Sequence, residues 1–151
     1  MNCYDDWWLP RDMENMGYIF EYCDKYCKEL FDVEIDKYKF LDTFMRSEIR
    51  KQMESGHPML LSQSGRDTVR KFVLVDLDGN LDIYKGKSQN IIEKQWYWVG
   101  WIYAYIHYKS KLSSKKIVNK LPLKKMLKMY YLGHEQSKET FYDRLVRENL
   151  I

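Results

Sequence analysis

The sequence predicts a mainly α-helical protein, a single domain (residues 1–151) with about five to six helices and a small β-hairpin near residues 72–84. Two observations predict this fold. Apolar residues recur every three or four positions over most of the chain, which is the spacing of amphipathic helices. Residues 96–108 are aromatic on nearly all sides, which is typical of a helix enclosed by its neighbours. A chain of 151 residues, 45% of them hydrophobic, is long enough for a buried core.

The first half of the chain contains three candidate helices. Apolar residues after Pro10 follow helical spacing, which predicts a first helix from about residue 11 to residue 30. Asp36 can cap a second helix that ends near residue 55. Ser64 can cap a short third helix, because an acidic residue follows three positions later.

Residues 72–84 break the helical pattern. Phe72 begins an apolar, β-branched run, and the turn-forming sequence Asp78-Gly79-Asn80 follows it. From Leu81 onward, apolar and polar residues alternate with the period of a strand. These features predict the small β-hairpin.

The aromatic helix is the expected centre of the fold. Three tryptophans and four tyrosines lie in residues 96–108, together with Gly100 and Ala104. The two small residues are four positions apart and therefore share one face of a helix. This face predicts a close contact with a neighbouring helix.

Three further helices are expected after the aromatic one. Ser113 or Ser114 can cap the first of them, Pro122 can begin the second, and Gly133 can end it. The last helix is expected from about residue 135 to residue 149.

The charges are distributed unevenly, although the formal net charge is only +3. Residues 1–54 contain eight Lys or Arg and thirteen Asp or Glu, a net charge of −5. Residues 94–134 contain nine lysines and no acidic residue. Such asymmetry is typical of an anion-binding face, or of two parts of one domain that attract each other.

The lysines after the aromatic helix are the candidate binding residues. Between Lys109 and Lys128 they fall on two short predicted helices joined at Pro122. A phosphate backbone bound there would release counterions, which strengthens binding at low salt. A patch matched to an acidic protein, or a merely solvated face, is an equally open interpretation. The selected residues are Lys115, Lys116, Lys120, Lys124, Lys125 and Lys128.

No catalytic, metal or cofactor signature stands out in the sequence. Asp76 and Asp78 follow an apolar run, as in the first motif of haloacid-dehalogenase-type phosphatases. That chemistry also needs carboxylates on later strands, and no acidic residue occurs between Glu93 and Glu135. We interpret the match as accidental and expect a non-enzymatic protein without metal or cofactor.

The cysteines indicate a reducing compartment. Cys3, Cys23 and Cys27 lack the spacing of a disulfide framework, and no apolar stretch reaches membrane-spanning length, so we expect a cytoplasmic protein without disulfides. Cys23 and Cys27, four positions apart, are expected to be small buried residues. His107 is expected to be a buried histidine satisfied by a hydrogen bond, although a cysteine–histidine pair stays open because partners meet in space rather than in sequence.

Several segments resemble a known group of proteins. The matching segments are residues 44–69, with Ser55-Gly56-His57-Pro58 and Ser64-Gly65-Arg66-Asp67, residues 97–105, Leu121-Pro122-Leu123, and Met129-Tyr130 followed by His134-Glu135. They resemble small uncharacterised proteins of Gram-positive bacteria (Firmicutes), which tend to be encoded beside toxin-antitoxin genes and on mobile elements. The resemblance implies a genetic context rather than a reaction. Lys124 and Lys125 stand where members tend to show a Ser-Glu pair.

Two functions are therefore expected, and neither involves a membrane. The first is a non-enzymatic interaction protein of a toxin-antitoxin or mobile-element context, which binds another protein through exposed aromatics and the acidic first half. The alternative is a nucleic-acid- or nucleoprotein-binding inhibitor of a bacterial defence nuclease, similar to an anti-CRISPR protein, that uses the basic segment from Lys109 to Lys128. The oligomeric state is left open.

Overall fold

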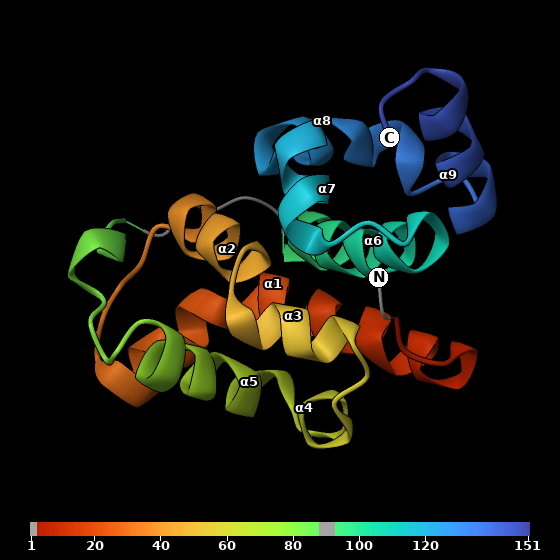
Figure 1. The fold of residues 1–151 in the computed structure, drawn as a ribbon. Helices are drawn as coiled ribbons and strands as arrows, with labels where there is room; N and C mark the ends of the chain where they lie inside the picture. The colour runs from red at the N-terminus through yellow and green to blue at the C-terminus, as the bar shows by residue number, and fades with distance from the viewer. Residues whose placement is uncertain (1–2, 88–92) are drawn as a thin grey trace.

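The computed structural model describes residues 3–87 and 93–151, and within these ranges it contains nine α-helices and no β-strand (Figure 1). The predicted mainly α-helical class is therefore confirmed. The helices are α1 (Leu9–Phe31), α2 (Lys37–Met45), α3 (Glu48–Glu54), α4 (Pro58–Ser62), α5 (Gly65–Lys71), α6 (Glu93–Ser110), α7 (Ser114–Lys120), α8 (Leu123–Gly133) and α9 (Lys138–Arg147). Three short helical segments complete the described structure: η1 (Asp6–Trp8), η2 (Phe72–Asp76) and η3 (Asp82–Tyr84).

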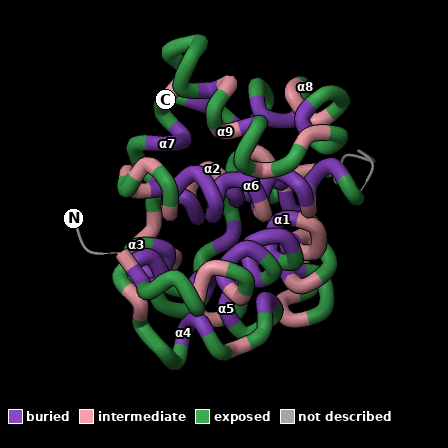
Figure 2. Tube along the Cα trace, turned by 90° about the vertical axis from the view of Figure 1, so that its right-hand side faces the viewer, coloured by how far each residue is buried: buried purple, intermediate pink, exposed green. Residues whose placement is uncertain are grey.

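Helices α1 and α6 lie against each other at the centre of the molecule (Figure 1). A Cβ atom added at Gly100 of α6 would meet the backbone carbonyl of Met16 and the ring of Phe20, both on α1. Glycine at this position permits the two backbones to approach closely. Trp96 and Trp98 are buried, and Figure 2 shows α6 as mostly buried along its length. The predicted enclosure of the aromatic helix is confirmed.

The remaining helices form layers on either side of this central pair. Helices α4 and α5 contact α1, whereas α7, α8 and α9 contact α6 (Figure 1). Buried apolar side chains from nearly all of these helices join in one core. Cys23 and Cys27 belong to this core as free thiols, as expected from their spacing.

The prediction of a β-hairpin at residues 72–84 is wrong. The apolar run continues α5 as the π-helical turn η2, and the segment that follows forms the 3-10 turn η3. Phe72 is fully buried, and its ring centroid lies 5.1 Å from that of Phe40 and 5.3 Å from that of Phe44. Burial of this ring against α2 outweighs the local preference of β-branched residues for strands.

The second predicted helix is divided in two. The break falls at Ser47, whose hydroxyl accepts a hydrogen bond from the backbone N–H of Arg50 at 3.1 Å and so caps α3. This division and the short helix α4 are two reasons why the structure has more helices than the five to six predicted. The caps expected at Asp36, Ser64 and Ser113 are confirmed.

Candidate binding face and the buried cluster behind it

The six candidate lysines are all exposed on α7 and α8. Among the residues that the structure describes, none of the six forms an ion pair with an acidic side chain. The Lys124 ammonium lies 5.3 Å from the centroid of the Tyr38 ring on α2, a cation–π contact. We call these six residues the basic face: Lys115, Lys116, Lys120, Lys124, Lys125 and Lys128.

The amphipathic pattern of the two helices explains why these lysines face solvent. In α7 the buried apolar residues are Ile117 and Val118. In α8 they are Leu123, Met126 and Leu127. Because one side of each helix is buried, the lysines occupy the outer positions.

The junction between the two helices is held from the core. Leu121 is fully buried, and its backbone carbonyl accepts a hydrogen bond of 2.6 Å from the hydroxyl of Tyr103 on the aromatic helix α6. Pro122 follows as the N-cap of α8, so the helix begins one residue later than predicted. The relative direction of the two lysine-bearing helices therefore depends on the enclosed aromatic helix.

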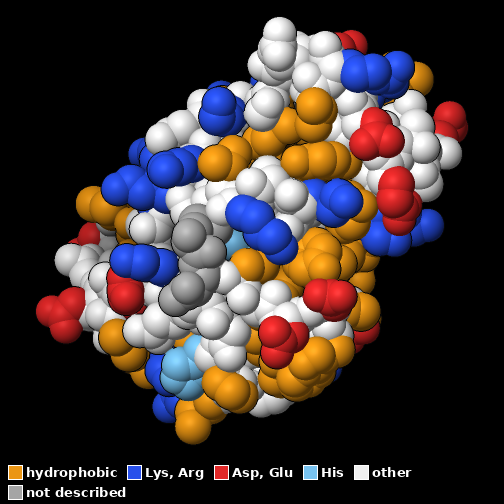
Figure 3. Space-filling model, turned by 45° about the vertical axis from the view of Figure 1, so that its right-hand side comes forward, with side chains coloured by type: hydrophobic (Ala, Val, Ile, Leu, Met, Phe, Trp, Pro, Cys, Tyr) orange, Lys and Arg blue, Asp and Glu red, His pale blue; other side chains and the backbone are white. Residues whose placement is uncertain are grey.

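Several Lys and Arg side chains gather on one part of the surface. In Figure 3, a run of Lys and Arg side chains lies along the upper left, while charges of both signs lie elsewhere on this face. Neither α7 nor α8 contains an acidic residue. A polyanion approaching the basic face therefore meets no carboxylate on these two helices.

A cluster of buried charges lies behind the first turn of α7. Arg50 on α3 and Asp12 on α1 are both 0% exposed and form a bidentate ion pair, with N–O distances of 2.7 and 3.0 Å. The Tyr4 hydroxyl donates to the same Asp12 carboxylate at 2.7 Å. A second carboxylate, Glu54 of α3, lies 3.4 Å from Arg50 Nε. Paired charges of this kind tolerate burial because each satisfies the other.

The cluster also holds the start of α7. Ser114 is buried, and its backbone N–H donates to Glu54 Oε1 at 2.8 Å. Arg50 Nε donates to the Ser114 hydroxyl at 3.1 Å. Since Ser114 precedes Lys115 directly, the buried ion pairs position the first residues of the basic face.

The charges of the cluster perturb one another. Burial by itself lowers the pKa of Arg50, but the carboxylates of Asp12 and Glu54 reverse this effect and raise it above its usual value. Burial and the Asp12 charge raise the pKa of the Tyr4 hydroxyl. Arg50 therefore stays charged and Tyr4 stays protonated.

His107 and Cys3 meet beside this cluster, although 104 positions separate them. The backbone carbonyl of Leu112 lies 2.7 Å from His107 Nδ1 and can only accept a hydrogen bond, so Nδ1 carries the proton. The other ring nitrogen, Nε2, can then accept from the Cys3 thiol at 3.5 Å. His107 is fully buried, which confirms the expectation of a buried, hydrogen-bonded histidine.

The protonation of this pair does not favour nucleophilic chemistry. Burial lowers the pKa of His107, and the Arg50 charge adds to this effect while Glu54 opposes it. Burial also raises the pKa of the Cys3 thiol. Thiol and imidazole are both neutral in consequence, whereas a nucleophilic cysteine requires a thiolate.

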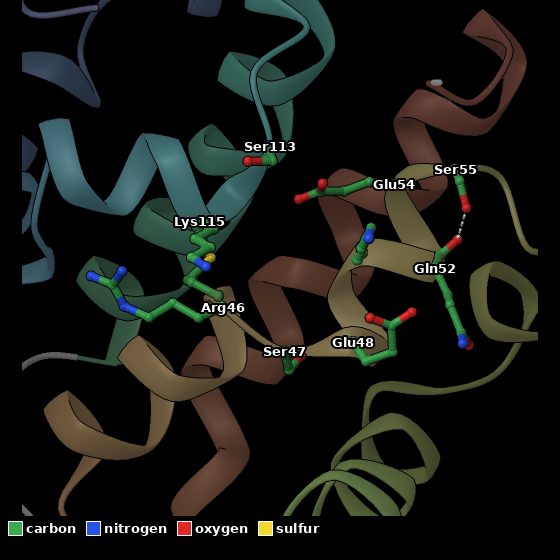
Figure 4. A pocket seen from close by; sticks show the side chains of 10 residues that line it. Arg46, Ser47, Glu48, Gln52, Glu54, Ser55, Ser113 and Lys115 are labelled. Carbon is green, nitrogen blue, oxygen red and sulfur yellow. Dashed lines mark hydrogen bonds between the residues drawn. The ribbon is translucent and has the colours of Figure 1, made fainter. Parts of the chain in front are cut away.

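A pocket of about 530 Å³ lies between α2, α3 and the first turn of α7. Its cations are Arg46, Lys51 and Lys115, and its carboxylates are Glu48 and Glu54. Lys115 and Arg46 both line the pocket, and Figure 4 shows them toward one end of it and Gln52 toward the other. Because Lys115 lines the pocket, this hollow adjoins the basic face.

The phosphatase-like motif lacks the strand that its chemistry requires. Asp76 ends the π-helical turn η2, and its carboxylate accepts a hydrogen bond of 3.1 Å from the backbone N–H of Ile49. Asp78 lies at an exposed turn with φ of 52°. Within residues 3–87 and 93–151, no group of three or more His, Cys, Asp or Glu is arranged to hold a metal ion.

The residues of the buried cluster were not among those predicted from the sequence to be functional. One signal was present at Asp12, which precedes the buried Met16 by four positions and so falls on the apolar face of the first helix. Arg50 and Glu54 likewise have the four-residue spacing of a helical ion pair. Nothing in the sequence indicates that these residues from two helices meet.

Comparisons with known proteins identify no relative. No protein-family model, no curated protein and no solved structure matches the chain. In the described part of the chain, no helix has both the length and the apolar character needed to cross a membrane.

Proposed function

We propose that the protein is a non-enzymatic binding protein whose basic face engages a polyanionic macromolecule, a nucleic acid or a nucleoprotein. The observation that carries this proposal is the exposure of six lysines on two adjacent helices that contain no acidic residue. Each phosphate neutralised by a lysine releases counterions, so such a surface binds nucleic acid without any need for a shaped cavity.

The acidic first half is less suited to serve as the binding surface. Several of its carboxylates form ion pairs within the protein. These pairs are Asp12 and Glu54 with Arg50, Asp24 with Lys37, Glu29 with Arg66, Asp32 with Lys28, and Asp42 with Arg46. The exposed aromatic residues Trp7, Tyr18 and Tyr131 lie on three different elements. A protein partner anchored by aromatics is therefore the second candidate.

The biological setting of this binding is also a proposal. An inhibitor of a bacterial defence nuclease would use such a face to compete for nucleic acid or for a nucleoprotein. The toxin-antitoxin or mobile-element context depends only on the sequence resemblance.

Salt dependence tests the proposed function. If four of the six lysines contact phosphates, affinity for a single strand falls about 50-fold between 50 and 200 mM salt. Replacing Lys120, Lys124, Lys125 and Lys128 with Glu should abolish this binding and its salt dependence, while the thermal unfolding temperature stays close to that of the wild type. Fluorescence anisotropy with a labelled oligonucleotide measures the affinity and its salt dependence.

A matched control separates the basic face from net charge. The same four charge reversals at Lys28, Lys39, Arg70 and Lys87, which are exposed and lie outside α7 and α8, change the net charge by the same amount. This control variant should bind almost as tightly as the wild type. Equal losses in both variants, or no binding by the wild type at low salt, would remove the proposed function.

A further inference from the structure

The outer side of α8 carries an aromatic ring next to its lysines. Lys124, Lys128 and Tyr131 follow one another at spacings of four and three residues, so they share one side of the helix. Tyr131 is 65% exposed, and the neighbouring Leu132 is 66% exposed. The two lysine ammonium groups and the exposed Tyr131 ring therefore lie within about 10 Å of one another along the helix axis.

The Tyr131 ring has a face available for stacking. The Tyr131 ring makes a T-shaped edge contact with the Tyr130 ring, at a centroid distance of 5.9 Å and an interplanar angle of 77°. Tyr130 in turn stacks on His134 at 4.2 Å. Tyr130 and His134 therefore pack beside the Tyr131 side chain, while most of the surface of Tyr131 faces solvent.

We propose that the basic face prefers single-stranded nucleic acid, with an unpaired base stacked on Tyr131 and the strand's phosphates held by the lysines of α7 and α8. This inference depends on the proposed function. Single-strand-binding proteins combine a cationic track with aromatic platforms, since every base offers a face for stacking. Bases in a duplex are already stacked and cannot use the ring in this way.

The same residues argue for weak sequence preference. Base-specific reading in a groove uses Arg, Lys, Asn or Gln, and the planar groups of Arg, Asn and Gln fix paired hydrogen bonds with base edges more rigidly than the flexible ammonium of Lys. Asn119 is the residue with such a planar group on α7 and α8, and the other polar side chains on their outer sides are lysines, which act as point charges. Stacking and phosphate contacts therefore carry most of the binding.

An anionic membrane surface fits this helix less well. A helix that lies in a membrane interface inserts a broad apolar face. The apolar side of α8, formed by Leu123, Met126 and Leu127, is buried in the protein core. Tyr131 and Leu132 alone offer a small apolar contact.

The test compares variants at Tyr131 on single- and double-stranded probes. The single-stranded probe is an oligodeoxythymidine of about 20 nucleotides, longer than the roughly 4–16 nucleotides that a single-strand-binding module covers. The duplex is the same strand paired with oligodeoxyadenosine. Tyr131→Ala should weaken binding to the single strand by about fivefold to 150-fold and leave duplex binding unchanged. Tyr131→Phe should restore it, since the ring is retained.

Two further measurements distinguish stacking from charge. Tyr131→Ala should keep the salt slope of the wild type, whereas Lys128→Gln should reduce the slope by about 0.7. The matched aromatic control is Trp7→Ala, because Trp7 is 67% exposed but lies on η1. This control should bind like the wild type.

The outcomes separate this inference from the proposed function. If the lysine variants lose binding while Tyr131→Ala binds normally, or if the duplex is bound as tightly as the single strand, the preference for single strands is wrong and the proposed function stands. If the wild type binds neither probe, both fail. Tyr131-dependent binding to vesicles of phosphatidylcholine and phosphatidylserine, without oligonucleotide binding, would also overturn both.

Discussion

Ser114 and Lys115 are neighbours on α7, yet the charges behind Ser114 are buried and paired, whereas those from Lys115 onward are exposed. Behind Ser114, Arg50 is enclosed with two carboxylates and is fully buried. From Lys115 onward, six lysines are exposed on two helices without acidic residues. Charges that are paired and buried hold helices in place, whereas exposed lysines without an acidic partner contribute little to stability and stay available to a ligand.

Charged residues of one chain therefore take different roles according to whether they are buried with a partner or exposed to solvent. The buried cluster joins α1, α3 and the start of α7. The basic face begins directly after Ser114, where α7 is held to the cluster. A change in the cluster should therefore act mainly on stability, and a change in the face should act mainly on binding.

The largest expected effect comes from removing the buried cation. Arg50→Ala leaves Asp12 and Glu54 buried without a partner charge and should lower the free energy of unfolding by about 3–5 kcal/mol. The matched change on the face, Lys125→Ala, should stay within about 0.5 kcal/mol of the wild type. Urea denaturation followed by tryptophan fluorescence measures both.

A second variant keeps this comparison interpretable if Arg50→Ala does not fold. Arg50→Lys retains the charge but loses the bidentate contact with Asp12, so its stability should lie below that of the wild type while the protein still folds. Equal stability of Arg50→Lys and the wild type would contradict the structural role of the cluster.

A smaller effect is expected where the two regions meet. Ser114→Ala removes the hydroxyl that accepts from Arg50 Nε, which should cost about 1–3 kcal/mol because a buried donor loses one partner. The exposed Ser62→Ala provides the control and should change stability by less than about 0.5 kcal/mol. Oligonucleotide affinity of the folded Ser114→Ala should stay near that of the wild type, because Glu54 still holds the backbone N–H of residue 114.

The smallest expected effect is a dependence of stability on pH. The pKa of His107 is lowered in the folded protein, so below about pH 6.5 the unfolded chain binds a proton that the folded chain resists. Stability should therefore fall as the pH falls through about 6.5 toward the lowered folded pKa. Asp12, Arg50, Glu54 and Cys3 face this ring and set the size of the effect.

Thermal unfolding between about pH 7.5 and pH 5 measures this dependence. His107→Gln should show a flatter stability profile in that range, since its side chain does not titrate. A profile identical to that of the wild type would assign the pH dependence to the carboxylates instead.

Most of the secondary structure could be predicted because its signals are local. Helical spacing of apolar residues located α1, α6, α7 and α8, and side-chain caps at Ser64 and Ser113 marked helix starts. The failure at residues 72–84 is equally instructive. Local β propensity there is overridden by contacts of Phe72 with rings on α2, which are distant in sequence.

The basic face and the buried cluster also differ in how far each could be predicted from local sequence signals. The basic face could be located from sequence, because exposed positions on an amphipathic helix follow from its period and from the absence of acidic residues nearby. The pairing of Asp12 with Arg50 could not, because 38 positions separate them. The contact of Cys3 with His107 is likewise a product of the packing of distant segments.

The sequence by itself determined a helical protein with an enclosed aromatic helix and a lysine-rich segment after it, since periodicity and composition act over a few turns of chain. The tertiary structure decided which charges became buried partners and which stayed in solvent. Burial depends on what the rest of the chain places around each side chain, and that environment decides whether a charge stabilises the fold or is left for a ligand.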